Sequence, residues 1–161
     1  DAKGNFFVGV AGGYAVDIGL SFILSSVLLV LSLDLGMAPN NEAILAGAAA
    51  DRGKLAVMSV VMAPIVEEPL FRGLLFGCIR PRSRAAAYIV SALLFSLYHV
   101  WQFVFISGDF GLLIYCLLYL PVSIGLAWAY DRSGSIWAAM LMHGIVNAVS
   151  LSVLESGMFG Y

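Results

Sequence analysis

One stretch decides the fold class of this chain: Pro64-Ile65-Val66-Glu67-Glu68-Pro69-Leu70-Phe71-Arg72-Gly73. It lies inside the apolar run 55–79, which at ~1.5 Å per residue is long enough to cross a hydrocarbon core of ~30 Å. An ionisable side chain at the centre of such a span costs about 2.5–3.5 kcal/mol. Glu68 and Arg72 are four residues apart and can pair on one helical face. Glu67 points roughly 100° away, so we expect other segments to supply its partners.

The composition indicates an integral membrane protein. Of 161 residues, 61% are hydrophobic and 11% are charged, whereas soluble domains carry about 25% charged residues. The formal net charge is −2 and no basic stripe occurs, which excludes nucleic acid as a partner. The chain begins at Asp1, so we expect a fragment of a longer helical bundle. A multi-pass protein of a bacterial plasma membrane is the expected location.

Hydropathy and helix breakers predict an all-α fold, a polytopic transmembrane helical bundle of about five spans. The expected spans are 6–33, 55–79, 85–106, 110–130 and 136–154. A short interfacial helix over 43–50 is expected, with Asn41 as its cap. Gly9 and Gly13 form a face of small residues on which another helix can pack closely. We expect one membrane domain, 1–161, with its core helices at about 55–154.

Two histidines and an asparagine lie in other predicted spans. His99 follows Phe95 by four residues, and His143 precedes Asn147 by four, so each pair shares a helical face. Counted from the span ends, these polar residues and Glu67 lie about 7 to 12 residues deep, within roughly two helical turns of one depth. Singly, each polar residue can be an interhelical contact. Together with an unpaired acid they predict a convergent site.

The residue types favour hydrolysis of an amide bond without a covalent intermediate. No His-Glu-x-x-His run of the zinc proteases occurs. A carboxylate and a histidine can activate water as a general base, and a second histidine and an amide can stabilise an oxyanion. No cofactor is expected. A divalent metal held by Glu67, His99 and His143 stays open as an alternative, since two histidines and a carboxylate are a known ligand set.

Three motifs in this order resemble a known family. They are Glu67-Glu68-x-x-x-Arg72, Phe95-x-x-x-His99 and His143-x-x-x-Asn147, and they resemble the motifs of the type II CAAX prenyl proteases in the CAAX protease and bacteriocin-processing (CPBP, or Abi) family. The resemblance implies that Glu67 and His99 activate water and that His143 and Asn147 form the oxyanion site. It also implies that Glu68 and Arg72 brace the first motif, and that the enzyme is an intramembrane endopeptidase working without metal.

Two other function classes stay open at this level. One is a membrane protein that binds a partner without proteolysis, as in bacteriocin immunity. The other is a proton or ion transporter that uses Glu67, His99 and His143 as a relay, against which the small number of spans argues. For a protease, the expected partners are the lipid bilayer and a peptide or membrane-protein substrate. The sequence does not specify the oligomeric state.

Overall fold

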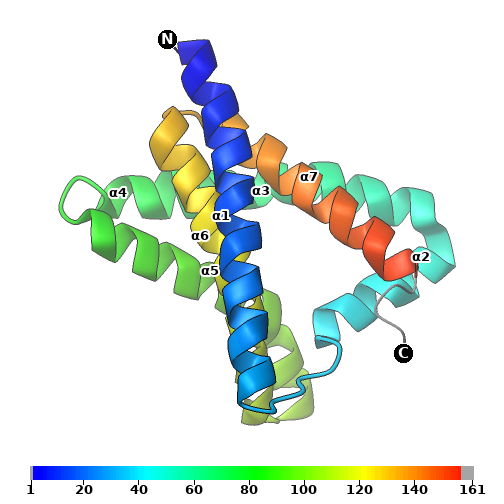
Figure 1. The fold of residues 1–161 in the computed structure, drawn as a ribbon. Coiled ribbons are helices and arrows are strands. Elements are labelled where there is room, and N and C mark those ends of the chain that lie inside the picture. Colours follow the sequence, from blue (N-terminus) through cyan, green and yellow to red (C-terminus); the bar gives the residue numbers. More distant parts are fainter. Residues whose placement is uncertain (1, 157–161) are drawn as a thin grey trace.

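The computed structural model describes residues 2–156, and these residues form helices and no strand (Figure 1). The elements are α1 (Ala2–Val30), α2 (Pro39–Ala56), η1 (Val57–Met62), α3 (Ala63–Glu68), η2 (Pro69–Phe76), α4 (Gly77–Ile79), α5 (Arg84–Ser107), η3 (Phe110–Tyr115), α6 (Cys116–Ser133) and α7 (Ile136–Glu155). The segments η1 and η2 are π-helical, and η3 is a 3₁₀-helix. The all-α prediction is confirmed.

Four helices in the described part of the chain are long and apolar enough to cross a membrane. They are Asn5–Val30, Arg84–Ser107, Phe110–Ser133 and Ile136–Glu155. Large apolar side chains such as Phe22, Val30 and Phe105 are exposed on them, as expected for faces that contact lipid. The remaining predicted span, 55–79, is helical throughout, but it is divided among α2, η1, α3, η2 and α4.

The connection before this divided segment differs from the expectation. The structure has the longer helix α2 in place of a short helix over 43–50, and its N-cap is Ala38 rather than Asn41. Pro39 occupies the first helical position, where its missing N–H costs nothing and its fixed φ is suitable. Inside α2 the backbone breaks at Asp51 (φ −157°, ψ 91°). The Asp51 carboxylate then accepts a hydrogen bond from the Lys54 N–H at 2.9 Å, and so caps the turns that lead into η1.

Two prolines explain the changes of helical type around the paired acids. Pro64 and Pro69 lack a backbone N–H and therefore cannot donate to the preceding turn. Pro64 lies in the first turn of α3 and Pro69 in the first turn of η2. Single π-helical turns inside α-helices are frequent at functional sites. The six residues of α3, which carry both acids, lie between two such segments.

The first helix, α1, packs along α6, as Figure 1 shows. A Cβ added at Gly13 would lie 2.7 Å from the Gly125 carbonyl oxygen, and one at Gly9 would lie 2.9 Å from the Ala129 carbonyl oxygen. Only glycine lets two helices approach this closely. The predicted small-residue face is therefore confirmed as a helix contact within one chain. Through α6, this contact supports the side of the bundle on which the polar residues converge.

Candidate active site

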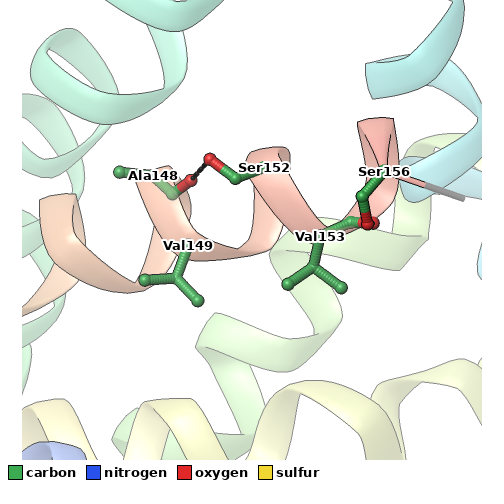
Figure 2. A pocket seen from close by; sticks show the side chains of 5 residues that line it. All are labelled: Ala148, Val149, Ser152, Val153 and Ser156. Atoms are coloured by element: carbon green, nitrogen blue, oxygen red, sulfur yellow. Dashed lines mark hydrogen bonds between the residues drawn. The ribbon is translucent and has the colours of Figure 1, made fainter. Parts of the chain in front are cut away.

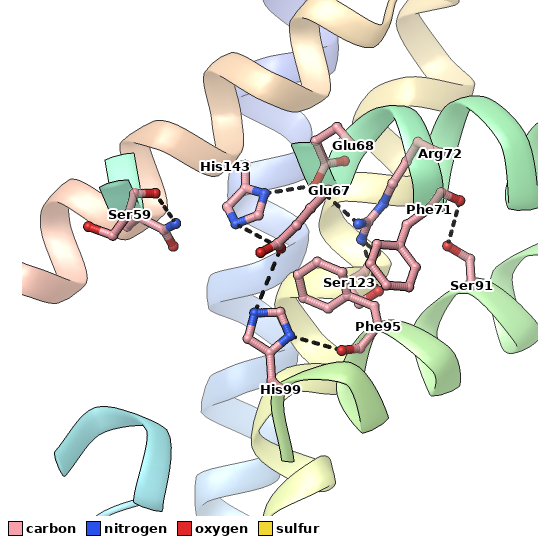
Figure 3. Close-up of polar contacts among 11 residues, drawn as sticks. Ser59, Glu67, Glu68, Phe71, Arg72, Ser91, Phe95, His99, Ser123 and His143 are labelled. Carbon is pink, nitrogen blue, oxygen red and sulfur yellow. Dashed lines mark hydrogen bonds and ion pairs between the residues drawn. The ribbon is translucent and has the colours of Figure 1, made fainter. Parts of the chain in front are cut away.

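Glu67 lies between the two histidines (Figure 3). Its carboxylate oxygen Oε2 is 3.8 Å from His99 Nε2 and 3.9 Å from His143 Nε2. The side chain is 10% exposed, and Oε2 has no hydrogen-bond partner within the described residues. Three segments supply this group: α3 carries the acid, α5 carries His99 and α7 carries His143. The predicted convergence of Glu67, His99 and His143 is thus present in the structure.

The second acid, Glu68, is fully buried and holds the other members of a charged cluster. Its Oε1 accepts from Arg72 Nη1 at 3.1 Å and lies 2.7 Å from His143 Nδ1. Arg72 Nη2 donates to the Ser123 hydroxyl at 2.9 Å and to the Ser123 carbonyl at 3.0 Å. The Arg72 guanidinium also lies over the Phe95 ring, 4.4 Å from its centre. This network fixes His143 from the side opposite Glu67.

His99 is held by its own helix and by α6. Its Nδ1 is 2.9 Å from the Phe95 carbonyl oxygen, so Nδ1 is protonated and donates a hydrogen bond to that oxygen. In the neutral ring Nε2 is then an acceptor, and it faces Glu67. The Phe95 ring lies 4.5 Å from the imidazole centre to centre, as expected from their spacing. Tyr119 of α6 stacks on His99, with the ring centres 4.8 Å apart and 22° between the planes.

Asn147 is in the same region but contacts a different group. Its Nδ2 donates to the backbone carbonyl of Ser59 in η1 at 2.7 Å. Figure 3 shows this hydrogen bond at Ser59, apart from the bonds around Glu67. The second N–H of the amide remains available as a donor. The structure therefore brings together Glu67, Glu68, Arg72, Phe95, His99 and His143, and gives Asn147 a backbone partner.

Two contributors from α6 were missed at the level of sequence. Tyr119 stacks on His99, and Ser123 binds Arg72. They are four residues apart and so share one helical face, on either side of Pro121. Polar side chains at that spacing within an apolar span were the available signal. Ser59 contributes its backbone carbonyl, and no side-chain pattern indicates such a partner.

No group of three or more His, Cys, Asp and Glu side chains in the described chain has a geometry suited to a metal ion. Both histidine Nε2 atoms lie almost 4 Å from the Glu67 oxygen, a separation that two ligands of one ion can have, since each zinc ligand lies about 2.0–2.2 Å from the ion. A divalent metal held by Glu67, His99 and His143 therefore stays an alternative.

A separate pocket on the C-terminal half of α7 lacks such chemistry (Figure 2). It is lined by Ala148, Val149, Ser152, Val153 and Ser156. The Ser152 hydroxyl donates to the Ala148 carbonyl of the same helix at 2.9 Å. No titratable side chain lines this pocket, so the candidate site is the cluster around Glu67.

Comparison with known proteins places these residues in a family. A family model described as type II CAAX prenyl endopeptidase Rce1-like matches residues 53–149, a range that includes every predicted site residue. The UPF0177 protein YxdF of Lactococcus lactis subsp. lactis (strain IL1403) is 28% identical over 95 residues, which are 59% of this chain and 47% of the relative. The chain thus spans about half the length of that curated relative. No solved structure matches significantly.

Proposed function

This chain belongs to the Rce1-like type II CAAX prenyl endopeptidase family, and we propose that it hydrolyses a peptide bond with a water molecule activated by Glu67 and His99. It is an integral multi-pass membrane protein, so its substrate is a peptide or a membrane protein that reaches the site from the bilayer or its surface. The observation that carries the proposal is the position of the Glu67 carboxylate between two imidazoles.

The distances around Glu67 are suitable for activating water. At 3.8 Å and 3.9 Å the carboxylate is too far from either imidazole for a direct hydrogen bond, and polar groups at such separations are commonly bridged by water. A water held between Glu67 Oε2 and His99 Nε2 would donate one hydrogen bond to each of these two acceptors. Its oxygen lone pair would then attack the carbonyl carbon of the substrate while Glu67 takes one proton. Glu67 later returns that proton to the leaving amine.

His143 is the candidate for stabilising the oxyanion. Its Nδ1 faces Glu68 at 2.7 Å, so its Nε2 donates a hydrogen bond only when the ring is an imidazolium. That charge state balances the cluster, because two carboxylates, Glu67 and Glu68, then face two cations, Arg72 and His143. Buried charges are tolerated when they are paired and hydrogen-bonded. The imidazolium Nε2–H can then donate to the negative oxygen that develops on the substrate.

Replacement of Glu67 tests the proposal. The chain is reconstituted in liposomes and incubated with a pool of lipid-anchored peptides that carry a fluorophore and a quencher. Glu67→Gln keeps the shape of the side chain and removes the base, so cleavage should fall by about 10²–10⁴-fold, the usual contribution of a general base. Glu155→Gln is the control, since Glu155 pairs with the exposed Arg52 away from the site. Glu67→Gln protein that is folded and cleaves at the wild-type rate would refute the proposal.

A further inference from the structure

The hydrogen bond of Asn147 has a cause in the backbone of η1. The Ala63 N–H donates to the Met58 carbonyl five residues earlier, which is the π-helical register. In that register the next N–H, at position 64, would donate to the Ser59 carbonyl. Residue 64 is proline and has no N–H. The Ser59 carbonyl therefore loses its donor at the very position where Asn147 Nδ2 approaches to 2.7 Å.

The next carbonyl in η1 faces the same helix. A Cβ added at Gly144 would lie 2.9 Å from the Val60 carbonyl oxygen. Gly144 thus lets α7 lie directly against the backbone of η1, with a Cα–H close to the Val60 oxygen. Gly144 and Asn147 are three residues apart and share one face of α7.

The position of this contact matters for the site. His143 precedes Gly144 on α7, and Glu67 follows Pro64 by three residues on α3. The contact of α7 with the Ser59 carbonyl and with the neighbouring backbone of η1 therefore sets the distance between His143 and the two acids. In an apolar environment a carbonyl without a partner is strongly unfavourable, so the Asn147 amide is favoured at this location.

We propose that Asn147 is a positioning residue: its amide replaces the N–H that Pro64 withholds from the Ser59 carbonyl, and this bond holds Glu67 in register with His143. Asn147 then acts on the reaction through the backbone of η1. The sequence-based expectation was different, since it placed the Asn147 amide at the oxyanion. The two roles predict different behaviour when the missing N–H is restored.

Restoring the donor is the kinetic test, and this arm rests on the proposed function. Asn147→Ala should lower kcat about 100-fold with an unchanged KM, because a displacement of about 1 Å can cost that much. Pro64→Ala in the same protein supplies an N–H at position 64 for the Ser59 carbonyl. The kcat of the double variant should therefore be at least tenfold higher than that of Asn147→Ala. Pro69→Ala with Asn147→Ala is the matched control and should regain nothing. A Pro64→Ala, Asn147→Ala protein that is folded and no faster than Asn147→Ala would overturn the proposal.

Solid-state NMR tests the contact without any substrate. Chain labelled with ¹⁵N in asparagine side chains and ¹³C in serine carbonyls should show a through-space contact between Asn147 Nδ2 and the Ser59 carbonyl carbon. Ser59→Ala retains the carbonyl but removes the label, so the signal should disappear and thereby be assigned. No such signal in the wild type would overturn the proposal, whatever the kinetics. If the contact is present and no peptide is cleaved, the positioning geometry stands and the proposed hydrolysis fails.

Discussion

Replacement of Arg72 is the most demanding test of the buried cluster. Its guanidinium is fully buried, donates to Glu68 and twice to Ser123, and covers the Phe95 ring. Arg72→Met keeps much of the volume and removes the charge, so Glu68 is left with a buried negative charge and fewer partners. Breaking a buried ion pair in this way costs about 3–5 kcal/mol. Ser123→Ala should cost less, about 1.5–3 kcal/mol, because it removes one hydrogen bond to a charged group.

The origin of the cost can be separated with a second substitution. Glu68→Gln neutralises the acid and keeps an oxygen that accepts from His143. If the bare charge dominates, Glu68→Gln with Arg72→Met should recover roughly 1–3 kcal/mol relative to Arg72→Met alone, which is the usual coupling within a charged network. Unfolding is followed by tryptophan fluorescence during titration of mixed micelles with denaturing detergent. A double variant at least as unstable as Arg72→Met would show that lost packing, and not an uncompensated charge, explains the effect.

Three further outcomes follow from other contacts. Gly13→Leu should destabilise the fold by about 1–3 kcal/mol in the same titration, because its Cβ would overlap α6. Gly19→Leu, with open space around it, should have no effect, and an equal loss of unfolding free energy in the two variants would contradict the close packing. Tyr119→Ala should lower kcat for the quenched peptides by roughly tenfold or less through loss of the ring stacked on His99, whereas Tyr119→Phe, which keeps the ring, should retain the wild-type kcat. Equal losses in the two variants would contradict a role for the stacked ring. Arg52→Gln should leave unfolding unchanged at low and high salt, since its ion pair is exposed, and a salt-dependent loss would be evidence against this.

The fold class and most of the site residues could be predicted from the sequence. Long apolar runs separated by short polar turns predicted α5, α7 and the span Phe110–Ser133 to within a few residues at each end, because a bilayer restricts a spanning helix to a narrow range of lengths and requires its backbone to be hydrogen-bonded internally. That last span is divided into η3 and α6. The cost of burying ionisable groups identified Glu67, Glu68 and Arg72 as residues that need partners. The pairing of Glu68 with Arg72 followed from their spacing alone.

Other features could not be predicted because they depend on the backbone. The π-helical register of η1 and η2 is a property of the backbone hydrogen bonds. Helix α2 continues through a kink at Asp51, whereas the sequence pattern predicted two separate helices there. The stacking of Tyr119 on His99 required the rotation of α6 about its axis, and hydropathy says little about that rotation in a helix that is apolar nearly all round.

By itself, then, the sequence determined that this chain is a helical membrane protein with an acid and two histidines at similar depth, and that Glu68 and Arg72 form a pair. Only the tertiary structure decided that Glu67 lies between His99 and His143, that Glu68 also holds His143, and that Asn147 binds the Ser59 carbonyl. Interactions within one helix follow from residue spacing. Interactions between helices depend on how each helix is rotated and how closely it approaches its neighbour. Here, close packing at glycines and the Ser59 carbonyl, which Pro64 leaves without a backbone donor, determine both.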